Sequence, residues 1–460
     1  MSRLVVVSNR VSPPGGGNAN QGGLAVALSA ALRESDGIWF GWSGNETEQF
    51  TGDIDYQRNE GVTTAMIDLE PQDTDEYYNG YANRTLWPLF HYRIDLAEYE
   101  RSFAGGYARV NTRFANTLNP LIEAKDLIWV HDYHLIPLGL GLRRLGCQNR
   151  IGFFLHIPWP PRRLLLTLPS HLQLVKSLFA YDVIGFQTRD SLDAFLDYVR
   201  DEMGLDVDMD GGFYVAGRWV HAIVCPIGID ADGFRHTAND PAARRKHAAM
   251  LESANGRAML VGVDRLDYSK GLPERLLGFE RFLAAHPEQH GQVFLLQITP
   301  PSRTDVGSYQ EMRSSLESLS GRINGAHATA EWVPIRYVNQ GYPRDELAAM
   351  YRAARVGLVT PLRDGMNLVA KEYVAAQDPE DPGVLILSRF AGAAEQLKQA
   401  LLVNPHSAED VADAIAAALA MPLEERIARW RPLMENVERE DVMWWMNFFI
   451  TSLRGARPSA

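Results

Sequence analysis

Short apolar runs alternate with longer segments of helical periodicity along most of the chain. A first series of runs lies at residues 3–8, 37–42, 127–131, 150–156, 182–187 and 221–226. A second series lies at residues 258–263, 292–298, 356–361 and 383–388. Continuous apolar strands separated by helices are typical of parallel sheets covered on both faces. The two series predict an α/β fold of two Rossmann-like, doubly wound domains whose strand ends face a central cleft.

The boundary between the domains is predicted in the polar segment that follows PIGIDADGF. We expect the first domain at residues 1–232 and the second at residues 233–440. A C-terminal helix at residues 441–460 could pack across the junction. The length of 460 residues supports this division, because single cores stop growing beyond about 300 residues.

Charge and cysteine content restrict the function more than the overall composition does. A formal net charge of −12 argues against a general nucleic-acid or anionic-membrane surface, which would need a basic field. No run approaches the roughly 20 apolar residues of a membrane span, and the N-terminal apolar stretch is too short for a signal peptide. The two cysteines, Cys147 and Cys225, cannot supply a disulfide framework or a thiolate metal site. We expect a soluble cytoplasmic protein that holds any anionic ligand with local cations.

Chemistry is expected where the strands end, because ligands of open α/β sheets bind beyond the carboxyl ends of the strands. In GVDRLDYSKGLPE, Arg265 and Lys270 follow one strand and precede a helix that starts near Gly271. Arginine grips phosphate with two donors, lysine adds a point charge, and a helix N-terminus adds partial positive charge. The pair could hold a phosphate, or it could be neutralised by the nearby acids Asp264, Asp267 and Glu274.

The stretch TPLRDGMNLVAKEY favours the phosphate. Asp364 precedes a helix that starts near Met366, and Glu372 lies inside that helix, eight positions after Asp364. Eight helical residues span about 12 Å, comparable to a sugar joined to a nucleoside by a diphosphate. One acid could then bind sugar hydroxyls and the other ribose hydroxyls, with the amides of residues 365–368 facing the diphosphate. Together with the two cations, this predicts a sugar-nucleotide site.

Strand ends in the first half carry further candidates. Arg10 follows the first strand, and a glycine-rich loop with Gly22 and Gly23 leads into an alanine-rich helix. Such a loop allows close backbone contact with a ligand, or it is simply a flexible connection. Asp132 could accept hydrogen bonds from a hydroxyl-rich ligand, and His156 could belong either to the site or to the core.

His131 and His134 lie on either side of Asp132 in the sequence and look like half of a metal site. A metal needs further ligands in suitable geometry, and one histidine ends a strand while the other begins a helix. We therefore predict no metal site.

Several residues suit a second, phosphorylated ligand. Arg303 follows the strand at 292–298, Arg344 starts a helix, and DEYYNGYANRTLWPLF supplies Tyr78 and Trp87. Aromatic rings stack on sugar faces and arginines hold phosphate, although the same residue types are ordinary core and rim material.

The chain carries, in order, the motifs SNR, GGL, GIWFGWSG, DEYYNG, LWPLFHYR, WVHDYHL, RIGFFLHIPWP, DVIGFQT, VDRLDYSKGLPER, GRING and TPLRDGMNLVAKEYVAAQ. Together they cover nearly the whole length and resemble the UDP-forming trehalose-6-phosphate synthases. These are retaining glycosyltransferases with two Rossmann-like domains, the GT-B fold. No phosphatase domain follows, so the chain resembles the synthase-only form.

The resemblance implies a role for each candidate. Arg265 and Lys270 would grip the diphosphate of UDP-glucose, Glu372 would bind the ribose, and His156 and Asp364 would bind hydroxyls of the donor glucose. Further donor contacts would come from Gly22, Gly23, Gly365, Met366, Asn367 and Leu368. The glucose-6-phosphate side would consist of Arg10, Tyr78, Trp87, Asp132, Arg303 and Arg344. The catalytic set would be Arg265, Lys270, His156 and Asp364.

The implied reaction moves glucose from UDP-glucose to glucose 6-phosphate by front-face attack, without a protein nucleophile, metal or cofactor. Alternatives are another acceptor, as in glucosylglycerol-phosphate synthesis, or a GDP- or ADP-sugar donor. A non-catalytic regulatory subunit is a third alternative, but it would be expected to lack Arg265, Lys270 or Glu372. The sequence leaves a homodimer or homotetramer open.

Two departures from the family pattern are visible. Trp159, Arg162 and Arg163 stand in HIPWPPRR, where the family usually has HIPFP followed by a small or polar residue and an acid. Tyr342 stands where the bacterial pattern often has Phe. Both departures are expected near the cleft, where they could change the fit of the acceptor.

Overall fold

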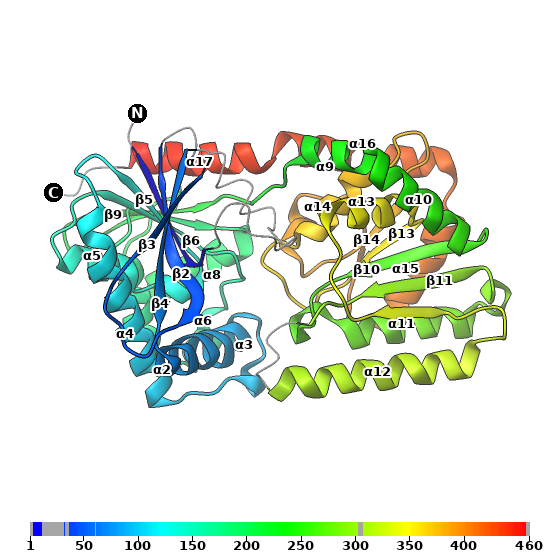
Figure 1. Cartoon of the computed structure of the whole chain (residues 1–460), viewed down its shortest axis with the longest axis horizontal. Helices are drawn as coiled ribbons and strands as arrows, with labels where there is room; N and C mark the ends of the chain where they lie inside the picture. Colours follow the sequence, from blue (N-terminus) through cyan, green and yellow to red (C-terminus); the bar gives the residue numbers. More distant parts are fainter. Residues whose placement is uncertain (1–2, 12–31, 33–35, 60, 302–306, 457–460) are drawn as a thin grey trace. The chain divides into compact units, whose positions relative to one another are not determined.

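The computed structural model describes residues 3–11, 32, 36–59, 61–301 and 307–456. The chain divides into two compact units (Figure 1). The described residues up to Pro226, together with those from Met443 onward, form the first unit, and Ile227–Val442 form the second. Each unit contains its own sheet.

The first unit contains a nine-stranded sheet with the order β3-β4-β2-β1-β5-β6-β7-β9-β8. Its strands are β1 (Leu4–Arg10), β2 (Ile38–Glu46), β3 (Asp55–Asn59), β4 (Val62–Leu69), β5 (Leu127–His131), β6 (Arg150–Phe154), β7 (Val183–Phe186), β8 (Gly212–Val215) and β9 (Arg218–Val224). The inner strands are parallel, and the edge strands β3 and β8 run antiparallel to their neighbours. The six strands predicted in this half are present, whereas β3, β4 and β8 were not predicted.

Helices of several kinds connect these strands. They are α2 (Pro71–Asp73), η1 (Thr74–Leu86), α3 (Trp87–Phe90), η2 (Ile94–Leu96), α4 (Arg101–Leu118), η3 (Asn119–Leu121), η4 (Tyr133–Leu135), α5 (Leu138–Arg144), α6 (Arg162–Leu165), α7 (His171–Leu178) and α8 (Arg189–Asp201). The last helix of the chain, α17 (Val442–Gly455), connects no strands. The helix η1 is a π-helix, a wide form that is rare over more than one turn.

The second unit contains a six-stranded parallel sheet with the order β12-β11-β10-β13-β14-β15. Its strands are β10 (Ala258–Val263), β11 (Val293–Ile298), β12 (Ile335–Val338), β13 (Val356–Val359), β14 (Val384–Ser388) and β15 (Leu401–Val403). The four predicted strands are present, and β12 and β15 extend the sheet on either side. The strand β10 lies between β11 and β13, so the strand order reverses beside it.

Helices cover both faces of this second sheet (Figure 1). They are α9 (Ala231–Asn239), α10 (Pro241–Ala254), η5 (Tyr268–Lys270), α11 (Leu272–Ala285), η6 (Pro287–Gln289), α12 (Gly307–His327), α13 (Arg344–Ala353), α14 (Leu368–Ala376), η7 (Gly392–Glu395), α15 (Ala408–Ala420) and α16 (Leu423–Arg439). Gly278 lets α11 approach α15 closely, because a Cβ there would lie 2.5 Å from Val411 Cγ1. Within the described ranges, no helix is long and apolar enough to serve as a membrane span.

The C-terminal helix α17 packs on the sheet of the first unit. The Phe449 ring stacks on Trp129 of β5 at 4.5 Å between centroids, and Trp445 lies 4.8 Å from the same ring. Gly152 of β6 makes room for this contact, since a Cβ there would lie 2.6 Å from Phe449 Cε1. The last helix of the chain therefore completes the core of the unit that contains the first strand.

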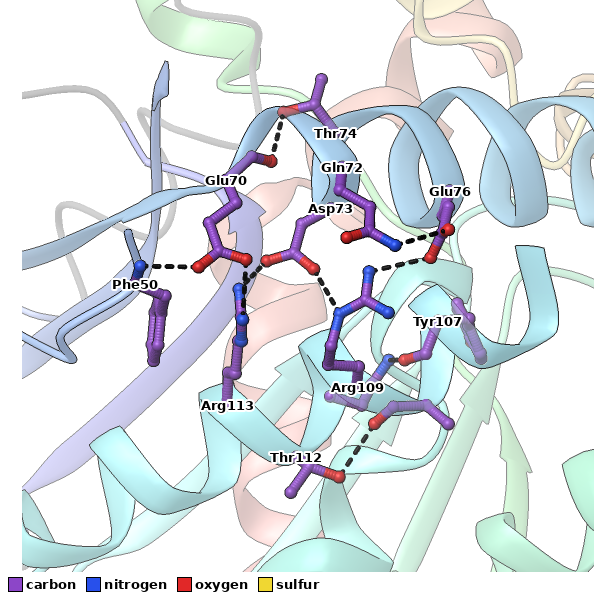
Figure 2. Close-up of polar contacts among 12 residues, drawn as sticks. Phe50, Glu70, Gln72, Asp73, Thr74, Glu76, Tyr107, Arg109, Thr112 and Arg113 are labelled. Carbon is purple, nitrogen blue, oxygen red and sulfur yellow. Dashed lines mark hydrogen bonds and ion pairs between the residues drawn. The ribbon is translucent and has the colours of Figure 1, made fainter. Parts of the chain in front are cut away.

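A network of carboxylates and arginines joins the start of η1 to α4 (Figure 2). Arg109 Nε donates to Asp73 Oδ1 at 2.8 Å, and its Nη2 donates to Glu76 Oε2 at 2.8 Å. Arg113 donates to Glu70 at 2.9 Å and also pairs with Asp73. Asp73 is fully buried, so its charge depends on both arginines. The amide of Phe50 and then Arg113 lower the pKa of Glu70.

Candidate active site

In the second unit, the ends of β10 and β13 lie together. The amide of Leu362, after β13, donates to Ser269 O, after β10, at 2.8 Å. Lys270 forms an ion pair with Asp364, and both side chains are mostly buried. The structure thus brings together two of the residues predicted to form the sugar-nucleotide site.

Two aspartates near the cations, Asp264 and Asp267, accept hydrogen bonds from other groups. Asp264 Oδ2 accepts from Arg275 Nη2 at 2.7 Å inside the core, where burial raises the pKa of Asp264 and Arg275 opposes the shift. Asp267 Oδ1 accepts from the amide of Ser269 at 3.0 Å, and its Oδ2 lies 3.6 Å from Arg265. The side chain of Arg265 is 43% exposed. Arg265 thus pairs with Asp267 and still exposes a large part of its side chain.

The loop before α14 is fixed by backbone hydrogen bonds. The amide of Asp364 donates to Phe390 O at 3.1 Å, and the amide of Ala393 donates to Met366 O at 2.8 Å. Asn367 has a left-handed conformation with φ of 75°, which is uncommon outside glycine, and its side-chain nitrogen Nδ2 donates to Asp364 Oδ2 at 3.1 Å. The predicted segment of Asp364, Gly365 and Met366 therefore leads directly to the N-terminus of α14.

Glu372 lies on α14 beside a second titratable residue. Desolvation raises the pKa of the Glu372 carboxyl to about 7, and Arg344 opposes the shift. Burial lowers the pKa of Lys371 to about 7, and its Nζ donates to Ile227 O at 2.7 Å. Arg344 begins α13, where its guanidinium lies over the Phe234 ring at 5.0 Å. The structure therefore places Arg344 with Glu372, and the predicted contact of Arg344 with an acceptor stays a prediction.

In the first unit, Arg10 at the end of β1 lies between two aromatic rings. Its guanidinium carbon is 4.5 Å from the Trp42 ring centre and 5.3 Å from that of Tyr78. Tyr78 in turn stacks on His134. The predicted residues Arg10 and Tyr78 are thus neighbours, and Trp42 joins them. Trp42 was not singled out from the sequence, although it ends the predicted apolar run at residues 37–42, and strand ends were where site residues were expected.

The ends of β5 and β6 bring two further predicted residues together. Asp132 Oδ1 accepts from the amide of His156 at 3.2 Å, and Asp132 has a φ of 74°. His131 Nδ1 lies 3.0 Å from His156 Nε2, and burial lowers the pKa of His156 to about 3. His131, first considered as a metal ligand, is therefore the partner of a predicted site residue.

The remaining predicted residues differ in their surroundings. Trp87 is buried, with its ring 4.1 Å from His91 and 5.7 Å from Tyr133. Gly22, Gly23 and Arg303 lie outside the described residues. No group of three or more His, Cys, Asp or Glu within the described ranges could hold a metal ion.

The two departures from the family pattern have local partners. The Trp159 ring is buried against Phe90 at 5.3 Å and Phe195 at 5.4 Å, so it is a core residue. Arg162 donates to Glu202, directly after α8, at 2.8 Å, while Arg163 is exposed. The Tyr342 hydroxyl accepts from Gln340 at 2.8 Å.

The family model of glycosyltransferase family 20 matches residues 11–455. The chain belongs to glycosyltransferase family 20. It is 51% identical over 457 residues to a trehalose-6-phosphate synthase of Sinorhizobium fredii (strain NBRC 101917 / NGR234), covering 98% of each chain. It is 47% identical over 458 residues to that of Cronobacter sakazakii (strain ATCC BAA-894), covering 100% of this chain and 96% of the relative.

Solved structures agree with this membership. A UDP-forming α,α-trehalose-phosphate synthase of Burkholderia xenovorans has a TM-score of 0.94 at 46% identity, with 99% of each chain covered. An Escherichia coli structure bound with UDP-2-fluoro glucose has a TM-score of 0.95 at 45% identity, covering 99% of this chain and 100% of that chain. The prediction of an α/β protein of the GT-B type with two parallel-sheet domains is confirmed.

Proposed function

We propose that this protein transfers glucose from UDP-glucose to glucose 6-phosphate, giving α,α-trehalose 6-phosphate and UDP. The observation that carries the proposal is the contact of Lys270 with Asp364 beside the N-terminus of α14, in a chain that matches trehalose-6-phosphate synthases over its full length. In this proposal, residues 1–232 bind the acceptor and residues 233–440 bind the nucleotide sugar. We expect a cytoplasmic enzyme, with a homodimer or homotetramer as its assembly.

The donor is proposed to bind along the loop and first turns of α14. Arg265 and Lys270 would hold the diphosphate, assisted by the positive end of the helix. Asp364 and His156 would accept or donate hydrogen bonds at the sugar hydroxyls, and Glu372 would bind the ribose. Gly22, Gly23 and residues 365–368 would add backbone contacts.

The acceptor is proposed to bind at the strand ends of the first unit. The exposed guanidinium of Arg10 would pair with the phosphate, while Trp42 and Tyr78 fix its orientation through ring contacts. Asp132 would accept from a sugar hydroxyl. Trp87, Arg303 and Arg344 complete the predicted set.

The chemistry then needs no protein nucleophile. The bond from the anomeric carbon to the UDP oxygen breaks, and the acceptor hydroxyl forms its bond on the same face. The acceptor proton passes to the departing phosphate, where Arg265 and Lys270 stabilise the growing negative charge. We expect no metal requirement, because these two cations and the amides of α14 neutralise the diphosphate.

A product assay tests the proposal. The purified protein is incubated with UDP-, GDP- or ADP-glucose and with glucose 6-phosphate or glycerol 3-phosphate, and the products are identified by NMR. The proposal predicts UDP release only with glucose 6-phosphate and a 1,1-linked α,α product. Release with glycerol 3-phosphate would identify the sibling activity, and binding without turnover would indicate a regulatory subunit.

A further inference from the structure

The buried pair of His131 and His156 connects the ends of β5 and β6. His131 Nδ1 and His156 Nε2 are 3.0 Å apart, which is a hydrogen-bond distance. His131 is fully buried, whereas His156 keeps part of its surface exposed at the end of β6. The second nitrogen of His156, Nδ1, is the one left for a ligand.

Both rings are neutral at ordinary pH. Desolvation lowers the pKa of His156 to about 3, and desolvation together with His156 lowers the pKa of His131 well below its usual value. The helix α17 contributes to this burial, because Trp445 lies 6.1 Å from the His131 ring and 6.0 Å from the His156 ring. Each neutral imidazole carries one proton, so one ring donates in this contact and the other accepts.

The surroundings of His131 Nε2 decide which ring donates. This nitrogen is buried and has no hydrogen-bond partner among the described residues. If His131 accepted at Nδ1, its own proton would sit on Nε2, leaving a buried N–H unpaired. An unpaired buried donor is among the costliest arrangements in a protein interior. His131 therefore carries its proton on Nδ1 and donates it to His156 Nε2.

We propose that His131 is a positioning residue that fixes His156 as its Nδ1–H tautomer, so that His156 offers a donor to a hydroxyl oxygen of the glucosyl group. The inference rests on the proposed function for the identity of the ligand only. The tautomer of His156 is a property of the unliganded protein and does not depend on the proposed function. In the opposite tautomer, Nδ1 would be an acceptor, and the same ring would bind the hydroxyl through the hydroxyl proton instead.

The first test is ¹⁵N NMR of the unliganded protein labelled at histidine. Couplings between ring protons and ring nitrogens distinguish the two neutral tautomers, and the His156→Gln variant identifies the His156 signals among the 12 histidines. We expect protonated Nδ1 and unprotonated Nε2 in His156. Protonated Nε2 would overturn the proposal whether or not the enzyme is active, and a failed product assay would leave this measurement intact.

A variant series tests the positioning role. His131→Phe keeps a ring of similar shape but removes the donor, whereas His131→Asn keeps an N–H near the position of Nδ1. In His131→Phe, we expect that His156 is no longer fixed as its Nδ1–H tautomer and that kcat falls about tenfold. The affinity for UDP should stay within about twofold of wild type. His131→Asn should retain the tautomer and most of the turnover.

Two comparisons separate this role from a purely structural one. His131→Phe added to His156→Gln should cost no further turnover, because the residue acts only through His156. His221→Phe, on β9, alters another histidine of the same unit and should change neither the tautomer nor kcat. The proposal would be overturned if His156 kept a fixed Nδ1–H tautomer in His131→Phe. It would also be overturned if His131→Phe lowered kcat equally in the wild type and in the His156→Gln variant.

Discussion

At the scale of single residues, the proposed site depends on how differently Arg265 and Lys270 are held. Lys270 is mostly buried and paired with Asp364, whereas Arg265 is partly exposed and its Nη2 lies 3.6 Å from Asp267 Oδ2. A lysine ammonium has three donors, so pairing with Asp364 leaves two for a phosphate. The Arg265 side chain is 43% exposed, so its guanidinium can meet a ligand that enters from solvent.

Arg265→Ala is expected to lower turnover about 100- to 1,000-fold, which is the usual effect of removing one donor that stabilises transition-state charge. Stability should change by no more than about 0.5 kcal/mol, because the side chain is partly exposed. UDP release from UDP-glucose and glucose 6-phosphate measures the first effect, and urea unfolding the second. Arg281→Ala, an exposed arginine on α11, is the matched control. Full turnover in Arg265→Ala would remove this residue from the site.

Glu372 is expected to make donor binding depend on pH. Its pKa of about 7 lies above the ordinary 4.5, so the folded protein retains a proton that the unfolded chain loses between about pH 4.5 and 7. Through this group, stability therefore falls as pH rises across that interval. The affinity for the donor should instead rise with pH, because the ionised carboxylate of Glu372 accepts stronger hydrogen bonds from ribose hydroxyls.

Affinity for UDP-glucose without acceptor should therefore fall about tenfold from pH 8 to pH 6. Calorimetric titration across this range measures it, and Glu372→Gln should remove the dependence. Lys371 also has a pKa of about 7, so Lys371→Met is the control variant. This variant should keep the pH dependence of the affinity for UDP-glucose. An unchanged pH profile in Glu372→Gln would refute the assignment.

Site residues that directly follow a strand could be predicted from the sequence. Contacts between side chains that are distant in the sequence could not. Asp364 and Lys270 were both identified because each follows an apolar run, and parallel strands end at the same edge of a sheet. The pairing of Asp264 with the fully buried Arg275 could not be foreseen, since an arginine within a helix usually faces solvent. His131 was not predicted as a site residue, because the sequence cannot show that His156 lies beside it.

At the scale of elements, the strands that were predicted differ from those that were missed in how apolar their sequences are. The ten predicted strands are apolar runs, whereas β3 (DYQRN) is polar and largely exposed at a sheet edge. In β4, Thr63 and Thr64 interrupt the apolar run, and β12 contains an arginine. Edge and interrupted strands lack the continuous apolar run that makes an inner parallel strand recognisable in the sequence.

The helix η1 also shows how an element is held by groups that the sequence does not pair. Its residues include Tyr78 of the proposed acceptor site, and its start is tied to α4 by Asp73, Arg109 and Arg113 (Figure 2). Tyr77 adds a second attachment, because its hydroxyl donates to Asn9 beside Arg10 at 2.7 Å. The network therefore positions Tyr78 against β1.

Asp73→Ala is expected to reduce the free energy of unfolding by about 1–3 kcal/mol, because Arg109 and Arg113 lose their shared buried carboxylate but keep Glu76 and Glu70. The KM for glucose 6-phosphate should rise more than the KM for UDP-glucose, since η1 carries an acceptor residue only. Urea unfolding and steady-state kinetics measure the two effects. Asp95→Ala breaks an exposed pair with Arg93 and should change stability by no more than about 0.5 kcal/mol. Equal losses in both variants would contradict the role given to the network.

At the scale of the whole molecule, the chain leaves the first unit after Pro226 and returns at Met443. The outgoing and returning segments are tied together within the second unit, where the amide of Val442 donates to Ile229 O at 3.1 Å. Gly228 is needed at this crossing, because a Cβ there would lie 2.3 Å from Glu440 O. The end of the chain is thereby directed into α17 and onto β5 and β6 of the first unit.

Phe449→Ala is expected to destabilise the first unit by about 3–5 kcal/mol, because the ring is fully buried between Trp129 and the two glycines Gly152 and Gly185. Tryptophan fluorescence in urea reports mainly on this unit, since only Trp332 and Trp430 belong to the other.

Phe448→Ala is the matched control on the same helix. Its ring is 40% exposed and stacks only on Trp444 among the described rings, so the loss should stay below about 1 kcal/mol. The fluorescence midpoint should therefore move to lower urea for Phe449→Ala alone. The helix also covers the pair of His131 and His156, so Phe449→Ala should raise hydrogen exchange at β5 and β6 before it affects β10 or β13. Equal midpoints for the two variants would mean that α17 rests on the first sheet without completing its core.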